Sequence, residues 1–300
     1  MAKTTAKKAT KAAGKVAGKG DASVTHRQVA ALFPCVPVTD GAGVKISRII
    51  GTPRLGQIDP FLLFDQFGSD DPHTYISGFP DHPHRGFETV TYMLAGHMRH
   101  KDNHGHEGVL GPGGVQWMTA GRGIIHSEMP EQAEGLMKGF QLWVNLPAAL
   151  KMREPRYQEF EADQLPLATP APGVTAKVIA GRLGNRRGPV EGIAVDPLYA
   201  DLRFEPRAAL EVPVAAGHTL LLFVFEGEVT IGEVAVPSGS LAAMGSEGEA
   251  LAMQAGAAGA AAMLLAAAPI GEPVVRYGPF VMNTREEIQQ ALEDYYMGRL

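Results

Sequence analysis

The amino-acid sequence predicts an all-β fold made of two small barrels, with a single helix at the C-terminus. Glycine (36 residues) and proline (22) repeatedly interrupt short apolar runs in this chain of 300 residues, which is typical of a barrel of short strands. A hydrophobic strand, a Pro-x-Gly turn and a second strand occur in 87–121 and again in 221–245. This loose repeat suggests two copies of one barrel. Only the stretch 283–300 has helical spacing.

The expected strands can be followed in order along the chain. Residues 44–68 predict a strand, a glycine turn and an extended segment, and shorter strands separated by glycine-rich turns come next. Pro147 ends the last strand of the first half, after which the pattern begins again. From residue 87 to the end of the second half, the runs expected to form strands are 87–95, 115–119, 124–128, 139–147, 174–180, 219–232 and 262–269.

The C-terminal stretch 283-NTREEIQQALEDYYMGRL-300 predicts an α-helix. Thr284 and Glu287 have the spacing of a capping box, in which each side chain bonds the backbone of the other residue. Ile288, Leu292 and Tyr295 recur at helical spacing and should form one buried stripe.

The first residues of the chain have a different composition from the rest. Six lysines and no acidic residue occur in residues 1–20, which leaves 21 basic and 32 acidic residues elsewhere, a formal charge of −11. Without large apolar residues this segment cannot offset its ordering entropy, so we expect residues 1–24 to be a disordered tail. The tail could bind a polyanion weakly, but the acidic body argues against nucleic acid as the main partner.

The single cysteine and the absence of long apolar runs indicate the compartment. Cys35 cannot form a disulfide within the chain, and its apolar neighbours are typical of a small buried residue. No run is long enough to span a bilayer, and no apolar segment follows the N-terminal lysines as in a secretory signal. We therefore expect a soluble cytoplasmic protein without a membrane partner.

Histidines alternate with other residues at two places in the strand-like sequence. Since residues i and i+2 of a strand share a face, His82 and His84 should point the same way, and so should His126 and Glu128. Glu88 would join the first pair if its strand continued without a bulge. If both strands face one barrel interior, three imidazoles and one carboxylate converge.

Such a set of ligands suits iron, manganese, nickel, copper, cobalt or zinc. A thiolate site is excluded because no second cysteine is present, and an octahedral ion with four protein ligands would keep two positions for substrate or dioxygen. The histidines in 97–106 lie near Asp102 and Gly105, and we interpret all four of them as solvated loop residues. The second half of the chain has only His218.

Several motifs resemble the cupin superfamily and, more closely, the pirin family. Two sets of residues resemble the two cupin motifs: Gly78, His82, His84, Glu88 and Gly96, and then Pro112, Gly114, Ala120, Gly121 and His126. Four segments look like pirin sequences: 56-GQIDPFLLFDQF-67, 82-HPHRGFETVTY-92, 116-QWMTAGRGIIHSE-128 and 278-GPFVMNTREEI-288. The resemblance extends from about residue 44 to the C-terminus.

The resemblance implies a bicupin, two β-barrels face to face, with one metal ion in the N-terminal barrel. The metal in this family is usually iron, and Fe²⁺ is the expected ion. The family's ligands correspond to His82, His84, His126 and Glu128. The general cupin pattern would instead nominate Glu88, which stays an alternative ligand or a supporting residue. We expect a metal-binding barrel in 25–147 and a barrel without ligands, ending in the helix, in 148–300.

The resemblance also implies quercetin 2,3-dioxygenase activity, in which a flavonol and O₂ react with release of carbon monoxide. Glu128 would then be both ligand and general base. We name four candidates for the apolar wall of the site: Phe87, Trp117, Met118 and Ile124. The alternative is a regulatory module that binds a protein partner and uses its metal as a structural or redox-sensitive switch.

Overall fold

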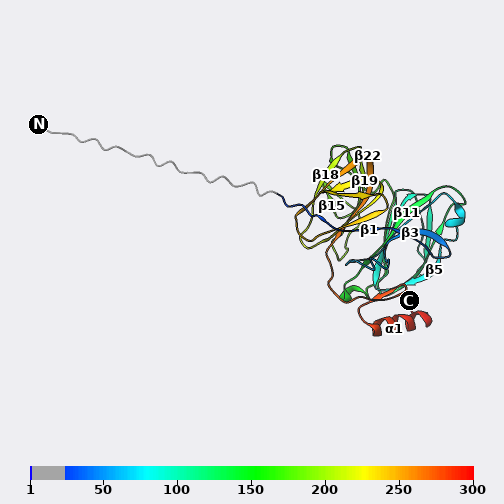
Figure 1. Ribbon diagram of the computed structural model, residues 1–300. Helices are drawn as coiled ribbons and strands as arrows, with labels where there is room; N and C mark the ends of the chain where they lie inside the picture. The colour runs from blue at the N-terminus through cyan, green and yellow to red at the C-terminus, as the bar shows by residue number, and fades with distance from the viewer. Residues whose placement is uncertain (2–23) are drawn as a thin grey trace.

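The computed structural model describes Met1 and residues 24–300. Two β-barrels lie side by side, and helix α1 (Arg285–Tyr296) lies below the first barrel, near β5 (Phe79–His84) (Figure 1). The predicted all-β fold with a C-terminal helix is therefore confirmed. The predicted tail, residues 1–24, falls almost entirely outside the described residues.

The first barrel combines two antiparallel sheets, and residues from both sheets pack together in an apolar cluster that includes Phe67 and Met98. The seven-stranded sheet contains, in spatial order, β12 (Arg156–Phe160), β9 (Val115–Thr119), β6 (Phe87–Ala95), β11 (Met137–Asn145), β4 (Phe61–Ser69), β3 (Val44–Ile50) and β2 (Val36–Asp40). The four-stranded sheet contains β5, β10 (Ile124–Pro130), β7 (Met98–Asp102) and β8 (Glu107–Leu110).

The second barrel is one nine-stranded antiparallel sheet. Its main path contains β1 (Val29–Pro34), β21 (Ser240–Met244), β19 (Thr219–Ile231), β22 (Ala250–Ala267), β17 (Leu198–Phe204), β14 (Val174–Ala180) and β13 (Leu167–Ala171). Strand β18 (Ala209–Pro213) pairs with β22, and β20 (Val234–Pro237) pairs with β19. The remaining short elements are β15 (Arg182–Leu183), β16 (Arg186–Arg187), β23 (Val275–Tyr277), β24 (Phe280–Met282) and the 3₁₀ turns Pro72–Thr74 and Ala148–Leu150.

Each end of the chain crosses to the other barrel. Strand β1 pairs with β21, so the first strand of the chain completes the second barrel. After β22 the chain returns to the first barrel, where Val281 packs with Leu62 and Phe87. The Val281 amide donates to the Arg85 carbonyl (3.0 Å). The boundary proposed at residue 147 stays a prediction, since elements from both ends cross it.

Strand alternation explains both the contact between the barrels and the position of the cavity described below. In β19 the side chains of Leu220, Leu222 and Val224 fill the second barrel, whereas Leu221 and Phe223 pack against the first. In β11 the residues Phe140, Leu142 and Val144 belong to the same inter-barrel core, and the alternate residues Gln141 and Trp143 face the first barrel's interior. The outer face of the seven-stranded sheet thus makes the interface, and its inner face is free to build a site.

Helix α1 has the predicted capping box. The Thr284 hydroxyl accepts from the Glu287 amide, and the Glu287 carboxylate accepts from the Thr284 amide. Ile288 is buried, and Leu292 and Tyr295 pack beside it. In the part of the chain that the structure describes, no helix is both long and apolar enough to cross a membrane.

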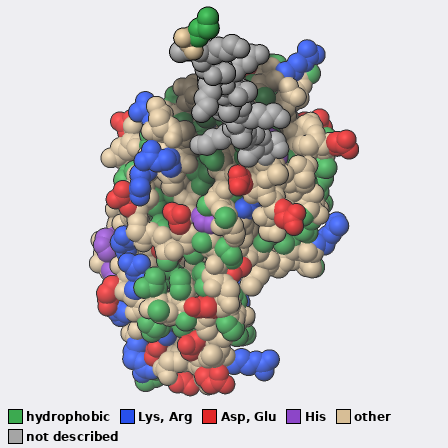
Figure 2. Space-filling view, turned by 90° about the vertical axis from the view of Figure 1, so that its left-hand side faces the viewer, with side chains coloured by type: hydrophobic (Ala, Val, Ile, Leu, Met, Phe, Trp, Pro, Cys, Tyr) green, Lys and Arg blue, Asp and Glu red, His purple; other side chains and the backbone are tan. Residues whose placement is uncertain are grey.

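The face of the molecule in Figure 2 shows Lys and Arg side chains interspersed with Asp and Glu. A nucleic-acid surface usually gathers basic residues on one face or along one stripe. This face therefore gives no support to a polyanion partner.

Candidate metal site

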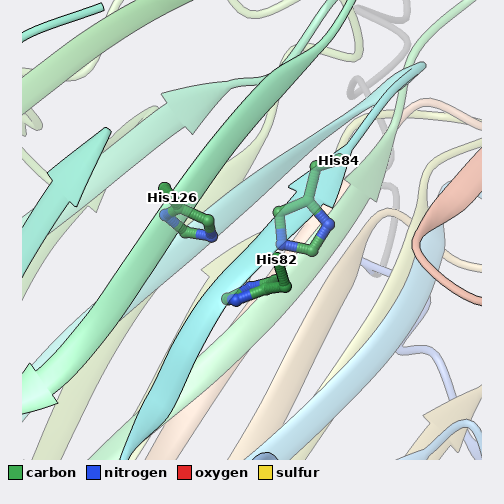
Figure 3. Close-up of side chains that lie close together, drawn as sticks. All are labelled: His82, His84 and His126. Carbon is green, nitrogen blue, oxygen red and sulfur yellow. The ribbon is translucent and has the colours of Figure 1, made fainter. Parts of the chain in front are cut away.

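Three histidines from two paired strands converge inside the first barrel. In the antiparallel pair β5–β10, His126 lies opposite His82, and Ile124 lies opposite His84. The ring centroids of the three histidines are 4.5 to 5.0 Å apart. One ligand nitrogen from each ring lies within 4.8 Å of the others, and Figure 3 shows the three rings pointing toward one another. The predicted alternation therefore brings these three imidazoles together.

The three rings have the polarity and the free nitrogens that a metal ion requires. His84 and His126 are buried, and Nδ1 of His84 and both ring nitrogens of His126 have no hydrogen-bond partner among the described residues. His82 places Nδ1 2.8 Å from the Pro80 carbonyl, which orients the ring and leaves Nε2 as the acceptor that can bind a metal. Buried polar atoms are rarely left unpaired, so these nitrogens fit a bound cation.

Burial lowers the pKa of His84 and of His126 well below the ordinary histidine value, and repulsion from the other imidazoles acts in the same direction. Both rings are therefore neutral near pH 7, which is the form of histidine that binds metals.

Glu128 lies two residues after His126 and faces the same interior, but it is not one of the three groups that meet within 4.8 Å. Its carboxylate accepts from the Thr91 hydroxyl (2.6 Å), which also lies 2.7 Å from Oε1 of Gln141. One hydroxyl proton can serve only one of these acceptors, and a carboxylate is the stronger one. Thr91 therefore holds Glu128 in place beside the histidines.

Glu88 is separated from the histidines because its strand does not continue from theirs. β5 ends at His84 and β6 begins at Phe87, with Gly86 at φ +91° between them. A side chain at Gly86 would collide with the Val281 carbonyl, so the break is also where the C-terminal segment packs. The Glu88 carboxylate accepts from Trp117 Nε1 (3.1 Å) and from the Thr119 hydroxyl (2.6 Å), and burial raises its pKa.

A cavity of about 510 Å³ opens beside His82, His84 and Glu128. Drug-sized ligands occupy cavities of this size in proteins. Its apolar wall comes from residues far apart in the sequence: Ile46, Leu63, Phe67, Phe79, Met98 and Trp143.

None of the four candidates for the apolar wall lines the cavity. Trp117 belongs to the inter-barrel core, and Met118 and Ile124 form a separate small cluster. Phe87 does not line the cavity, but it packs against the rings of His84 and Trp143 behind it. The hydrophobic pattern marked these residues as buried, but the break at Gly86 and the strand order decide which buried residues face the site.

Two carboxylates in the cavity wall share one arginine. Arg48 contacts Asp65 through two nitrogens (2.9 and 2.8 Å) and also reaches Asp40 (2.5 Å). Burial raises the pKa of Asp65 to about 6 although Arg48 opposes this shift, and Arg48 itself has a raised pKa because of that pairing. Both acids and Arg276 line the cavity, and the sequence patterns indicated none of them.

The interpretation of the histidines in 97–106 as loop residues is wrong for one of the four. His97, His104 and His106 are exposed, but His100 is buried on β7, with Nε2 2.9 Å from Glu159. Gln116 contacts the same nitrogen. Met98, His100 and Asp102 alternate in the sequence with the charged Arg99 and Lys101, and this alternation is the signal that would have placed His100 on a strand.

The other isolated residues of interest lie away from this site. His218, in the second barrel, is 4.0 Å from Asp196, and Cys35 packs at the edge of the inter-barrel core.

Three imidazoles with a nearby carboxylate, and no thiolate, suit a divalent ion of the iron-to-zinc series and leave positions open for a ligand.

Comparisons with known proteins agree with this geometry. Two family models match the chain, Pirin over residues 43–144 and the Pirin C-terminal cupin domain over residues 199–300. A pirin-like protein of Caulobacter vibrioides is 53% identical over 264 residues, which cover 88% of this chain and 95% of that protein. A Pseudomonas aeruginosa protein named "putative quercetin 2,3-dioxygenase" is 50% identical over 282 residues, 92% of this chain and 98% of that protein. The crystal structure of quercetin 2,3-dioxygenase from Acinetobacter baumannii has a TM-score of 0.85 at 32% identity, covering 91% of this chain and 98% of that one.

Proposed function

The chain belongs to the pirin family, and from this premise we propose that it is a metal-dependent dioxygenase that cleaves flavonols with O₂ and releases carbon monoxide. The observation that carries the proposal is the convergence of three imidazoles, two of them buried with unpartnered nitrogens, beside a cavity of about 510 Å³ that His82 and His84 line. The dioxygenase names of two similar proteins support the same reaction.

We propose His82, His84, His126 and Glu128 as the residues that hold the metal ion, with Fe²⁺ as the physiological ion. The neutral imidazoles supply the nitrogen ligands, and Glu128 can offer its second carboxylate oxygen while Oε1 keeps the hydrogen bond from Thr91. Glu88 is a weaker candidate, because its two oxygens are already occupied by Trp117 and Thr119. A divalent ion in this site would supply Lewis-acid and redox chemistry for the reaction with dioxygen.

The residues of the chain have two further tasks in the proposed reaction. Glu128 accepts the proton of the flavonol 3-hydroxyl, and the hydrogen bond from Thr91 keeps its carboxylate directed into the cavity. The apolar wall, with Leu63, Phe67 and Trp143, packs against the flat rings and excludes water from the electron-rich flavonolate. In the overall reaction, one flavonol and one O₂ give one ring-opened ester and one carbon monoxide.

The test is an assay of the protein after anaerobic reconstitution with Fe²⁺. We expect quercetin to disappear on admission of O₂ and carbon monoxide to appear in equal amount. Glu128→Gln should lose turnover, whereas His106→Ala is the matched control because His106 is an exposed histidine outside the cavity.

Iron-loaded protein that consumes no quercetin would refute the dioxygenase proposal. If such protein still captured a partner and His126→Ala abolished that capture, the regulatory alternative would replace it.

A further inference from the structure

Arg276 reaches the cavity from the C-terminal half of the chain. It lies on β23, in the segment that leaves the second barrel after β22 and crosses to the first. Two contacts fix the backbone of this segment: a β-bridge between Arg85 and Phe280, and a hydrogen bond from the side-chain Nζ of the buried Lys151 to the Val281 carbonyl (3.0 Å). Arg276 is therefore held at the mouth of the cavity by the packing of its neighbours.

The guanidinium group of Arg276 lies over Trp143, one of the two tryptophans of the chain. Its Cζ atom is 4.6 Å from the centroid of the Trp143 ring, and that ring also contacts the rings of Phe87 at 4.5 Å and His84 at 5.2 Å. Nε and Nη1 make long contacts with two backbone carbonyls, Gly278 (3.2 Å) and Leu62 (3.4 Å). Arg276 is thus two ring contacts from the proposed metal ligands.

Arg276 has no carboxylate partner among the described residues, in contrast to Arg48 and Arg203. Within residues 24–300, no Asp or Glu oxygen lies within 4.0 Å of its guanidinium group. Arg48 pairs with two carboxylates of the cavity wall, Asp40 and Asp65. Arg203, which lies over Phe225 at 4.9 Å in the second barrel, bonds Asp201 through two nitrogens. An arginine side chain without an anion, with donors free at a cavity mouth, is suited to bind an anion from outside.

We propose that Arg276 is the specificity-determining residue of the site, and that it binds an anionic substituent, a carboxylate or an ionised phenol, on the far side of an aromatic ligand. The inference rests on the proposed function for the ligand's other end, which lies at the histidines. The ligand class is therefore an aromatic acid or polyphenolate rather than a neutral arene, and Trp143 lines the cavity between Arg276 and the ring of His84.

The charges around Arg276 allow this assignment. Asp40 and Asp65 lie in the same cavity wall and attract Arg276 at longer range, but Arg48, which bonds both of them, repels it. If Arg276 only balanced these two acids, Arg276→Lys, which keeps the positive charge, would leave the preference for an anionic ligand unchanged. A direct contact between the guanidinium group and the anion instead predicts that the lysine variant loses part of this preference.

The experiment compares 3-hydroxyflavone with its 4′-carboxylate derivative, on metal-containing protein under anaerobic conditions so that no turnover occurs. Binding is followed by quenching of Trp143, which is half-buried in the cavity wall, whereas Trp117 is fully buried away from it. We expect the wild type to prefer the carboxylate, and Arg276→Gln to weaken its binding by about 10- to 100-fold while changing 3-hydroxyflavone by less than about 3-fold. Arg276→Lys should retain part of the preference.

Arg203→Gln is the matched control, since it removes another arginine from an aromatic ring outside the cavity, and it should change neither affinity. Equal weakening of both ligands by Arg276→Gln, or no preference for the carboxylate in the wild type, would overturn the proposal. Failure of the flavonol reaction itself would appear separately, as absence of carbon monoxide from iron-loaded wild type that still shows the charge preference.

Discussion

The two barrels have similar antiparallel architecture but different interiors. The second barrel is filled by a continuous set of buried aliphatic side chains, including Leu222 and Leu264, in the way that small barrels usually fill their interior. The first barrel instead directs three histidines and a carboxylate inward, around a cavity of about 510 Å³. Unpartnered buried nitrogens and open space cost stability, so their concentration at His84 and His126 beside one cavity of the first barrel indicates that they are used.

Removal of one histidine from the first barrel should have the largest effect. His84→Ala should abolish quercetin turnover by iron-reconstituted protein, because two imidazoles and a carboxylate hold the ion poorly. It should also abolish the rise in melting temperature that metal gives the wild type. Calorimetry with and without added Fe²⁺ under argon measures the second effect. A His84→Ala protein with the wild-type metal-induced rise would show that the ion binds elsewhere.

The carboxylate prediction compares the two glutamates near the histidines. Glu128→Gln should lower turnover by about 10²- to 10⁴-fold through loss of the general base. Glu88→Gln should leave turnover close to that of the wild type, because Glu88 bonds Trp117 and Thr119 away from the cavity. Steady-state assays at saturating quercetin measure both.

Metal analysis of Glu88→Ala and Glu128→Ala tests which of the two glutamates is the metal ligand. Loss of metal in Glu88→Ala, with metal retained in Glu128→Ala, would mean that Glu88 is the carboxylate ligand.

A core substitution in the second barrel should lower stability without affecting metal binding or turnover. Leu222 is fully buried in the apolar interior, so Leu222→Ala should lower the free energy of unfolding by about 2–5 kcal/mol through lost burial and a residual cavity. Metal content and turnover should remain normal at a temperature where the variant is folded. Urea unfolding and metal analysis on one preparation measure both quantities. Loss of metal from folded Leu222→Ala would show that the two interiors are coupled.

The histidines should also make the metal-free first barrel sensitive to acid. Burial lowers the pKa of His84 and His126 in the folded protein, so the unfolded chain alone gains their protons as the pH falls through about 6.5. The free energy of unfolding should therefore fall with decreasing pH, by up to about 1.4 kcal/mol per pH unit for each histidine.

His126→Ala isolates this effect, because the raised pKa of Asp65, which acts in the opposite direction, is common to both proteins. Urea unfolding of chelator-treated protein at pH 7.5 and 5.5 should show a smaller drop for His126→Ala than for the wild type. Equal drops would mean that His126 is not held neutral by the fold.

The smallest predicted effect concerns the helix beside the first barrel. Thr284→Ala removes the side chain that caps α1 and should cost about 1 kcal/mol. Turnover should be unchanged, because the helix supports the segment behind the site and its cap touches no residue of the cavity wall. Thermal unfolding measures the cost, and a loss of turnover without loss of structure would mean that α1 positions the site directly.

Much of the fold and the histidine cluster followed from local patterns. Strand alternation predicted that His82 and His84 share a face with each other, and the capping box predicted the start of α1. The same rule failed for Glu88, because Gly86 interrupts the strand where Val281 packs closely, and a contact so distant in sequence leaves no local pattern.

Local sequence patterns could not predict the cavity residues that come from elements distant in the sequence. Arg276 enters the cavity through the crossing of the chain between barrels, and Asp65 and Trp143 belong to strands whose inner faces are known only once their partners are known. The position of His100 could have been predicted, because Met98, His100 and Asp102 occupy alternate positions of β7. The polar residues around it suggested a loop instead.

The proposed metal site is tested most directly by the iron content of purified protein, measured by elemental analysis after anaerobic reconstitution and removal of excess metal. We expect one ion per chain in the wild type and in His106→Ala, and almost none in His126→Ala. A wild type that retains no ion, or a folded His126→Ala protein that retains a full complement, would contradict it.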